Sequence, residues 1–348
     1  LSSSGTTGLP KNAVHTYSSV WHACIQGCAF LDLKPDESTY FPEPLPLTTA
    51  VWPATALTLY RGATLYLGDS FDPKVRLEDI YKYKPTKPFC FSTMMPDIIN
   101  YPGAVKYNTG KFAFWWGSGG LPLVKYTKRC EELFGVKYYV GYCSVEQTPI
   151  TWIRPEDWEV MDLTRGVLPQ GRGIAGGEFK IVNEKGEELD PYEVGEIIYR
   201  GPNMFIGYLN DPEKTEETIR EGWIHGGDIG YMDELGYLYA YGRKEDAIIT
   251  EGNLVPPVML DSVMTEHPAV AECQTIGVPH KELGGAVKTV VVLMPDRKAT
   301  PGELVDWCRP RVPSYALPKS IVFVDSLPKG AKGIPKIAEI KGEWGKEL

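Results

Sequence analysis

The sequence predicts an α/β protein with a large domain built on a mostly parallel sheet, an antiparallel β subdomain, and a small, mobile α+β domain at the C-terminus. Three observations lead to this prediction. Short apolar segments alternate with helix-like segments over residues 1–151, as in parallel strands connected by helices. Over residues 152–242, segments in which apolar and polar residues alternate are separated by Gly, Asn, Asp and Pro. This pattern indicates antiparallel strands. Residues 243–348 carry a mixed pattern of their own, long enough for a small domain.

In the first part, residues 12–14 look short and extended. Apolar spacing then predicts a helix over residues 15–31, with Thr16 or Ser18 as its N-cap. Buried strands are expected where short apolar runs lie between helical segments, at residues 45–47, 63–67, 88–91, 112–117 and 136–141.

Further along the chain, alternating patterns predict antiparallel strands at residues 178–182, 195–200 and 236–241. The last part is expected to contain two helices and two strands. We place the helices at residues 260–267 and 303–309, and the strands at residues 287–293 and 320–324.

The composition narrows the function. The 348 residues include 36 Lys and Arg against 45 Asp and Glu, a net charge of −9, which argues against nucleic acid as a main partner. No apolar run is long enough to cross a bilayer. The seven cysteines are scattered without a CxxC pair, which is typical of reduced thiols in the cytoplasm. Because the chain opens on Leu1 with no complete strand before a glycine-rich loop, we expect a fragment whose start is missing.

That loop, from Ser3 to Lys11, is the most informative segment, with the sequence Ser-Ser-Gly-Thr-Thr-Gly-Leu-Pro-Lys. Its glycines let the backbone approach a ligand closely, and backbone N–H groups in such a turn converge on an anion. The hydroxyls can donate to phosphate oxygens, and Lys11 adds a mobile positive charge. The segment therefore predicts a phosphate-binding loop without the Walker spacing; the alternative is a flexible turn.

Four further motifs follow in order. The glycines of Ser118-Gly119-Gly120 would let a flat base lie against the backbone at the end of an aromatic strand. At the end of the next strand, Tyr142 offers a stacking face and Glu146 a hard oxygen ligand for Mg²⁺.

The other two motifs come later in the chain. Asp228 lies in a sequence that we interpret as a glycine-rich turn, suited to a bidentate grip on ribose hydroxyls, and Arg243 gives a fixed cation just before the domain break. Each motif alone is usually structural: a turn, a strand end, a helix cap or a surface ion pair. The ordered set is far more specific than any one of its members.

This ordered set resembles the AMP-forming adenylate-forming superfamily, which comprises acyl- and aryl-CoA synthetases, adenylation domains of peptide synthetases and firefly luciferases. The resemblance covers essentially the whole chain and implies ATP, Mg²⁺ and CoA as cofactors and a small-molecule carboxylic acid as substrate. Family members carry a large stretch before the loop, so this chain resembles a member without it. The implied roles are phosphate binding for Ser4, Gly5, Thr6, Thr7, Gly8 and Lys11, adenine binding for Gly119, Gly120 and Tyr142, Mg²⁺ binding for Glu146, and ribose binding for Asp228 and Arg243.

The resemblance also implies a reaction. A carboxylate attacks the α-phosphate of ATP, pyrophosphate leaves, and the acyl group of the acyl-AMP passes to the CoA thiol. Thr6, Thr7, Lys11 and Glu146 would stabilise the charge at phosphorus. The small domain would turn about a hinge at Glu245, where Asp or Lys is usual. Two alternatives stay open: an adenylation domain that serves a carrier protein, and a catalytically degenerate nucleotide-binding homologue.

Several positions depart from the family pattern. The lysine that bridges the acyl carboxylate and the α-phosphate is Ile334 here, and we expect Lys336, or otherwise Lys332, to take its role. Two threonines of the family motifs are Val145 and Gly226. The acyl pocket is expected to include Thr48, Thr49 and Cys143. Because cysteine is intermediate in size at that position, we expect a medium-sized acyl or aryl acid, although core packing explains Cys143 equally well.

Overall fold

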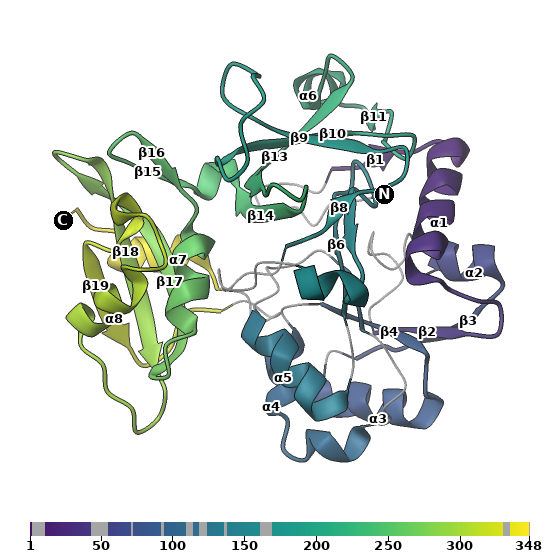
Figure 1. The fold of residues 1–348 in the computed structure, drawn as a ribbon, viewed down its shortest axis with the longest axis horizontal. Helices are drawn as coiled ribbons and strands as arrows, with labels where there is room; N and C mark the ends of the chain where they lie inside the picture. Colours follow the sequence, from purple (N-terminus) through teal and green to yellow (C-terminus); the bar gives the residue numbers. More distant parts are fainter. Residues whose placement is uncertain are drawn as a thin grey trace.

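The computed structural model describes residues 1, 11–42, 55–70, 72–91, 94–108, 114–117, 124–135, 138–160, 169–329 and 335–347. A seven-stranded sheet lies at the centre of the first half of the chain (Figure 1). Its strands are β2 (Ser38–Phe41), β3 (Thr64–Leu67), β4 (Lys87–Phe91), β5 (Phe114–Gly117), β6 (Tyr138–Tyr142), β7 (Thr151–Ile153) and β8 (Arg172–Gly173). They are arranged in the order β3-β2-β4-β5-β6-β7-β8. The strands from β3 to β6 are parallel to their neighbours, whereas β7 and β8 are antiparallel.

Helices cover both faces of this sheet, as its parallel part requires. They are α1 (Tyr17–Leu31), α2 (Leu57–Arg61), α3 (Pro73–Tyr83), α4 (Met95–Asn100) and α5 (Val124–Phe134). Figure 1 shows α1 and α2 on one side and α3, α4 and α5 on the other. Helix α1 begins after Thr16, whose hydroxyl accepts the Ser19 N–H at 3.0 Å in a capping box. Helix α3 begins after Asp72, whose carboxylate accepts the N–H groups of Lys74 and Val75.

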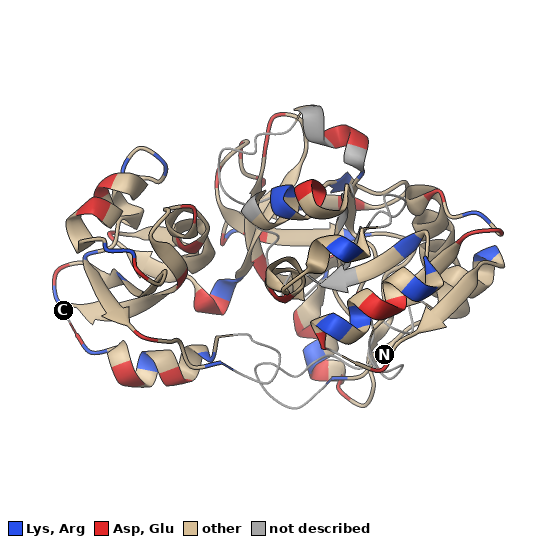
Figure 2. Cartoon of the chain, turned by 90° about the horizontal axis from the view of Figure 1, so that it is seen from below, with Lys and Arg blue, Asp and Glu red and all other residues tan. Residues whose placement is uncertain are grey.

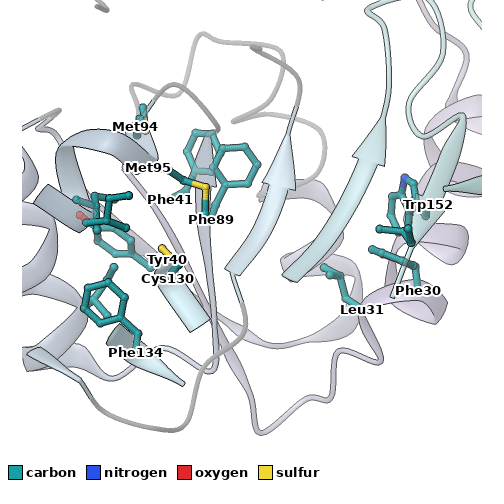
Figure 3. Close-up of a cluster of buried hydrophobic side chains, with 14 of the residues drawn as sticks. Phe30, Leu31, Tyr40, Phe41, Phe89, Met94, Met95, Cys130, Phe134 and Trp152 are labelled. Atoms are coloured by element: carbon teal, nitrogen blue, oxygen red, sulfur yellow. The ribbon is translucent and has the colours of Figure 1, made fainter. Parts of the chain in front are cut away.

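Aromatic side chains fill the core on both sides of the sheet. In Figure 3, Phe41 and Phe89 lie in one group and Phe30 and Trp152 in another, with strands between them. The rings of Phe41 and Phe89 have centroids 4.7 Å apart, and those of Phe30 and Trp152 3.8 Å apart. All four are buried, and each such side chain contributes about 1.5–3 kcal/mol by leaving water. Trp152 on β7 pairs with Gly141 of β6, so this packing lies next to the end of β6, whose last residue is Tyr142.

A second, antiparallel sheet follows. Its strands are β9 (Glu178–Val182), β10 (Gly195–Arg200), β12 (Ile219–Arg220), β13 (Trp223–Met232) and β14 (Leu238–Arg243). The order is β12-β13-β10-β9, with β14 on β13. The pairing of β13 with β14 sets Asp228 opposite Arg243. A separate two-stranded ladder joins β1 (Ala13–Val14) to β11 (Gly207–Tyr208), and α6 (Pro212–Thr218) follows it.

The C-terminal part contains a three-stranded sheet and lies beside the rest of the molecule (Figure 1). Its elements are β15 (Ile248–Thr250), β16 (Asn253–Val255), α7 (Pro257–Thr265), β17 (Val270–His280), β18 (Gly284–Leu293), α8 (Pro301–Cys308), β19 (Ser320–Val324) and α9 (Ile337–Trp344). Strand β18 pairs antiparallel with β17 and parallel with β19. Leu260, Val287 and Leu304 are fully buried between this sheet and its helices. The short 3₁₀ turn η5 (Lys244–Asp246) connects β14 to this part.

Short 3₁₀ turns complete the described elements: η3 (Ala104–Tyr107), η4 (Pro155–Val160) and η6 (Ser314–Ala316). In the part of the chain that the structure describes, no helix has both the length and the apolar character to cross a membrane. Figure 2 shows acidic and basic residues mixed along the helices. On α3, for example, Lys74 and Glu78 lie one turn apart with their charged atoms 3.9 Å from each other.

The predicted fold class is confirmed, and so are most of the elements. The helix over residues 15–31 is α1, and Thr16 is its N-cap rather than Ser18. The strands expected at residues 63–67, 88–91, 112–117 and 136–141 correspond to β3, β4, β5 and β6. The expected strand at residues 45–47 lies outside the described residues. The division at residues 151 and 242 stays a prediction; β7 and β8 continue the large sheet past residue 151.

One prediction about local structure is wrong. Asp228 lies inside strand β13, not in a glycine-rich turn. The glycines around it serve close packing: a Cβ on Gly226 would lie 2.6 Å from the Tyr199 hydroxyl oxygen. Several strands were not predicted, among them β2, β13 and β17, and these three are integral to their sheets.

Candidate active site

Tyr142, Asp228 and Arg243 form one network where β6 meets the antiparallel sheet. The Tyr142 hydroxyl donates to Asp228 Oδ2 at 2.5 Å, and Arg243 Nε lies 3.3 Å from Asp228 Oδ1. Arg243 also donates from Nη1 to the Gly226 carbonyl oxygen at 2.5 Å. The Asp228 side chain is only 16% exposed, whereas that of Arg243 is 49% exposed. The network therefore presents a buried carboxylate that is held by a hydroxyl on one side and a cation on the other.

Glu146 lies four residues beyond β6 in a turn that hydrogen bonds define closely. Ser144 Oγ accepts the N–H groups of Glu146 at 3.2 Å and Gln147 at 3.1 Å. The Glu146 carbonyl oxygen accepts the Phe205 N–H at 2.7 Å. The Glu146 carboxylate accepts a short hydrogen bond from the Tyr208 hydroxyl at Oε1. The backbone of this turn is thus fixed on both sides, and a tyrosine holds the side chain.

Lys11 approaches the same place from the end of the predicted phosphate loop. Its Nζ lies over the Tyr208 ring, 5.6 Å from the centroid. The ladder between β1 and β11 sets Ala13 opposite Tyr208, so the chain that leaves the loop runs beside the strand that carries Tyr208. Lys11, Tyr208 and Glu146 therefore form a second network, in which a cation and a carboxylate contact one aromatic side chain.

Burial and the two carboxylates set the protonation of the site. Burial raises the pKa values of the Tyr142 and Tyr208 hydroxyls, and Asp228 and Glu146 respectively raise them further. Both hydroxyls therefore remain donors at neutral pH. Burial also raises the pKa of Asp228, although Arg243 and the bond from Tyr142 oppose this. For Arg243, burial is the largest single influence and lowers the pKa, but Asp228, Tyr142, Glu146 and Tyr199 together raise it overall.

The two networks are close to each other. Tyr199 links their surroundings: its hydroxyl donates to Ser144 Oγ at 2.8 Å, and its ring packs edge-on against Tyr142 with centroids 6.3 Å apart. The charge of Glu146 also acts on Asp228 and raises its pKa. The structure thus brings together five residues singled out in the sequence, namely Lys11, Tyr142, Glu146, Asp228 and Arg243.

Other predicted site residues lie elsewhere or outside the described residues. Lys336 is the first residue before α9, and its Nζ lies 2.6 Å from Glu339 Oε1 on the same helix. Glu245 is exposed within η5, and Cys143 is half-buried directly after β6. The predicted site residues that lie outside the described residues are Ser4, Gly5, Thr6, Thr7, Gly8, Thr48, Thr49, Gly119, Gly120, Lys332 and Ile334.

Sequence reasoning did not find Tyr208 or Ser144. Tyr208 is 62 residues from Glu146 along the chain, and no spacing rule connects positions that far apart. Its only sequence signal is local: Gly207-Tyr208 precedes Asp211, which caps α6 by accepting the Lys214 N–H. Such a signal predicts a helix start and says nothing about a carboxylate.

The sequence is similar to families and proteins that are already known. The model of the AMP-binding enzyme family matches residues 2–209, and that of the AMP-binding enzyme C-terminal domain matches residues 260–333. Feruloyl-CoA synthase of Amycolatopsis sp is 30% identical over 348 residues, which cover 98% of this chain and 69% of the relative. 2-Succinylbenzoate–CoA ligase of Geobacillus kaustophilus is 33% identical over 331 residues, which cover 94% of this chain and 65% of the relative.

A solved structure of an ATP-bound protein also has the same fold as this chain. ATP-bound MatB from Rhodopseudomonas palustris superimposes with a TM-score of 0.85 at 26% sequence identity, covering 99% of this chain and 67% of that one. The family models, the relatives and the fold agree over nearly the whole chain. The chain therefore belongs to the AMP-binding enzyme family, the adenylate-forming superfamily that its motifs resemble.

Proposed function

We propose that the protein is an AMP-forming acyl-CoA synthetase, which activates a carboxylic acid with ATP and transfers the acyl group to the thiol of CoA. One observation carries this proposal. Five charged or aromatic residues from four motifs converge in two adjoining networks. The relatives at about 30% identity support the reaction class, since they are named as CoA synthases or CoA ligases of carboxylic acids.

In this proposal, Tyr142, Asp228 and Arg243 bind the nucleoside part of ATP. The carboxylate of Asp228 accepts hydrogen bonds from the ribose hydroxyls, and its bonds to Tyr142 and Arg243 hold it in place beforehand. The Tyr142 ring offers its face to adenine. Arg243 favours the ionised form of this carboxylate and so opposes the effect of burial, because an unpaired buried charge is costly.

Glu146 suits Mg²⁺ by the chemistry of its donor. A carboxylate is a hard oxygen ligand, and Mg²⁺ is commonly held by one or two carboxylates together with substrate phosphates. Within the described residues, no group of three or more His, Cys, Asp and Glu could hold a metal by itself. When bound, Mg²⁺ would neutralise negative charge on the phosphates.

The first half-reaction joins the acid to AMP. A carboxylate oxygen forms a bond to the α-phosphorus, the bond from that phosphorus to pyrophosphate breaks, and pyrophosphate leaves. Lys11, with Thr6 and Thr7 of the loop, would stabilise the charge on the phosphates. Lys336 would take the role of the missing lysine at Ile334. Its pair with Glu339 lies on the surface, and such a pair is worth only about 0–1 kcal/mol, so little energy keeps it there.

The second half-reaction transfers the acyl group. The thiol sulfur of CoA forms a bond to the acyl carbon and loses its proton, and AMP leaves with the bonding electron pair. We propose that the C-terminal part turns about η5 between the two steps, since one site has to serve two reactions. Glu245, at the centre of η5, is exposed and so can change its backbone angles without repacking.

The acid is proposed to be a medium-sized acyl or aryl acid. Support comes from the size of Cys143 and from relatives named for feruloyl and 2-succinylbenzoate substrates. We also propose a cytoplasmic location. The six cysteines whose side chains the structure describes are free thiols, as in a reducing compartment.

A second acceptor is worth testing, because a structural neighbour is titled as an amide bond synthetase, McbA from Marinactinospora thermotolerans. It has a TM-score of 0.86 and 26% identity. Incubation of the protein with ATP, Mg²⁺ and an acid, followed by CoA, an amine or a carrier protein in separate reactions, distinguishes the acceptors. We expect a thioester with CoA. Product only with the amine or the carrier protein would contradict the proposed acceptor.

A further inference from the structure

Tyr208 occupies a position that its two strands and the following helix determine. It ends β11, where pairing with β1 sets it opposite Ala13. Its N–H donates to Thr215 Oγ1 in α6 at 2.9 Å. The residue before it, Gly207, has φ 146°, and a Cβ there would lie 2.7 Å from Thr215 Cγ2. Backbone pairing, a hydrogen bond and close packing thus fix the backbone position from which the Tyr208 side chain extends.

From this position Tyr208 reaches two charged groups of the site. Its hydroxyl donates to Glu146 Oε1, and Lys11 Nζ lies over its ring. A glutamate side chain has three rotatable bonds, and a hydrogen bond to one oxygen of its carboxylate restricts the directions that the other oxygen can take. The backbone of Glu146 is already fixed by Ser144 and Phe205. The hydroxyl of Tyr208 therefore restricts the freedom that remains to this carboxylate.

We propose that Tyr208 is a positioning residue that holds the Glu146 carboxylate in the orientation needed to bind the Mg²⁺ that accompanies ATP. This inference rests on the proposed function, in which Glu146 is the metal ligand. Ligating carboxylates are commonly hydrogen-bonded by residues behind them, and the loss of such a partner typically costs about 10–100-fold in metal affinity.

The test separates metal binding from nucleotide binding. The affinity for ATP is measured by calorimetry with Mg²⁺ and again with EDTA, and the ratio of the two dissociation constants reports the contribution of the metal. Tyr208→Phe keeps the ring over which Lys11 lies and removes only the hydroxyl. We expect this variant to reduce the ratio about tenfold or more and to leave the affinity measured with EDTA unchanged.

The matched control is Tyr40→Phe. Tyr40 lies on β2 of the seven-stranded sheet and is buried, and its hydroxyl also donates to a carboxylate, Asp79 Oδ2 on α3 at 3.0 Å. The Tyr40→Phe variant also loses a hydrogen bond from a tyrosine hydroxyl to a carboxylate, so it controls for general destabilisation. It should leave the ratio of the two dissociation constants unchanged. Thermal unfolding of both variants checks that each is folded at the temperature of the titration. A ratio that falls equally in the two variants would overturn the inference.

Glu146→Gln distinguishes a failure of this inference from a failure of the proposed function. If Glu146→Gln reduces the ratio and Tyr208→Phe does not, then Glu146 binds the metal without help from Tyr208, and the inference is wrong. If Glu146→Gln leaves the ratio unchanged, the metal role of Glu146 in the proposed function is wrong, and the inference goes with it. If both variants reduce the ratio and the double variant reduces it no further than Glu146→Gln, the two residues act as one unit.

Discussion

Two largely buried aspartates, one in each part of the molecule, have different surroundings. Asp228 on β13 contacts a cation, Arg243, as well as the Tyr142 hydroxyl. Asp261 on α7 accepts hydrogen bonds from neutral donors: the Thr275 N–H at 2.7 Å and the Gln274 side-chain amide at 3.2 Å. Burial raises the pKa of Asp261 to about 7.

The different surroundings of Asp228 and Asp261 indicate different roles for the two carboxyl groups. Arg243 keeps a negative charge stable on Asp228 next to further polar side chains, which suits a group that has to bind a ligand. The hydrogen bonds of the Asp261 side chain all join α7 to β17, which suits a group that fixes a helix onto a sheet. The predictions below test this contrast and the connection between the two parts.

The largest effect is expected where the two parts join. Glu245→Pro fixes φ and removes a backbone N–H in η5. If the C-terminal part has to turn there, this change should block one half-reaction and leave the other largely intact. Single-turnover measurements of acyl-AMP formation and of thioester formation from acyl-AMP give the two rates. Glu245→Ala, which leaves the backbone free to turn, is the control. Equal effects of Glu245→Pro on both rates would contradict a hinge at this position.

The next effect concerns Asp228. Asp228→Ala removes both proposed ribose acceptors and should weaken ATP binding by about 1.5–3 kcal/mol, the usual contribution of hydrogen bonds to a charged group. Calorimetric titration with ATP measures it. Asp261→Ala is the matched control in the other part of the molecule, and it should leave ATP affinity unchanged. Equal ATP affinity in the Asp228 variant and the unmodified protein would refute the ribose assignment.

A comparable but purely structural effect is expected for Asp261. Its pKa in the folded protein, about 7, lies above its ordinary value of 3.8, so the folded state binds more protons than the unfolded state between these values. Stability contributed by this group is therefore fully present below pH 4 and is lost as the pH rises towards 7. Between pH 5 and pH 7 the loss should be about 2 kcal/mol.

Hydrogen exchange of the α7 and β17 amides at the two pH values measures this loss, since it follows local opening rather than global unfolding. Asp261→Asn, which does not titrate, should remove most of the difference. A pH dependence that persists in this variant would show that another group is responsible.

The smallest effect is expected for Lys336. Lys336→Ala should slow ATP–pyrophosphate exchange, by less than Glu245→Pro slows its affected half-reaction. It should change stability by no more than about 1 kcal/mol, because its pair with Glu339 lies on the surface. Lys341→Ala, on the same helix, serves as the control. Ile334→Lys should accelerate exchange. If exchange is insensitive to Lys332→Ala, to Lys336→Ala and to the double change, neither lysine has the proposed role.

Sequence patterns predicted much of the fold because local physics determines it. The helix α1 follows from apolar spacing and the Thr16 cap, and strands such as β9 and β10 follow from alternation. The strand β13 could not be predicted in this way. Its glycines at positions 226 and 227 look like a turn, but Gly226 is needed because the Tyr199 hydroxyl approaches closely.

The site was predictable only in part, for a similar reason. Tyr142, Glu146, Asp228 and Arg243 belong to recognisable motifs, so a family resemblance could single them out. Tyr208 belongs to none of these motifs, and its contact with Glu146 arises from the ladder between β1 and β11. That ladder pairs segments almost two hundred positions apart, and pairing over such a distance depends on the folded structure as a whole.

The most direct test of the central claim is acid-dependent exchange of labelled pyrophosphate into ATP, measured for the unmodified protein and for Asp228→Ala with short, medium-sized and aromatic acids. Exchange requires an acyl-AMP that forms and reverses on the protein. We predict exchange that needs both Mg²⁺ and an acid, is fastest with a medium-sized or aromatic acid, and falls strongly in Asp228→Ala. If the protein binds ATP but exchanges no pyrophosphate with any acid, it is a nucleotide-binding protein without adenylating activity, and the account is wrong.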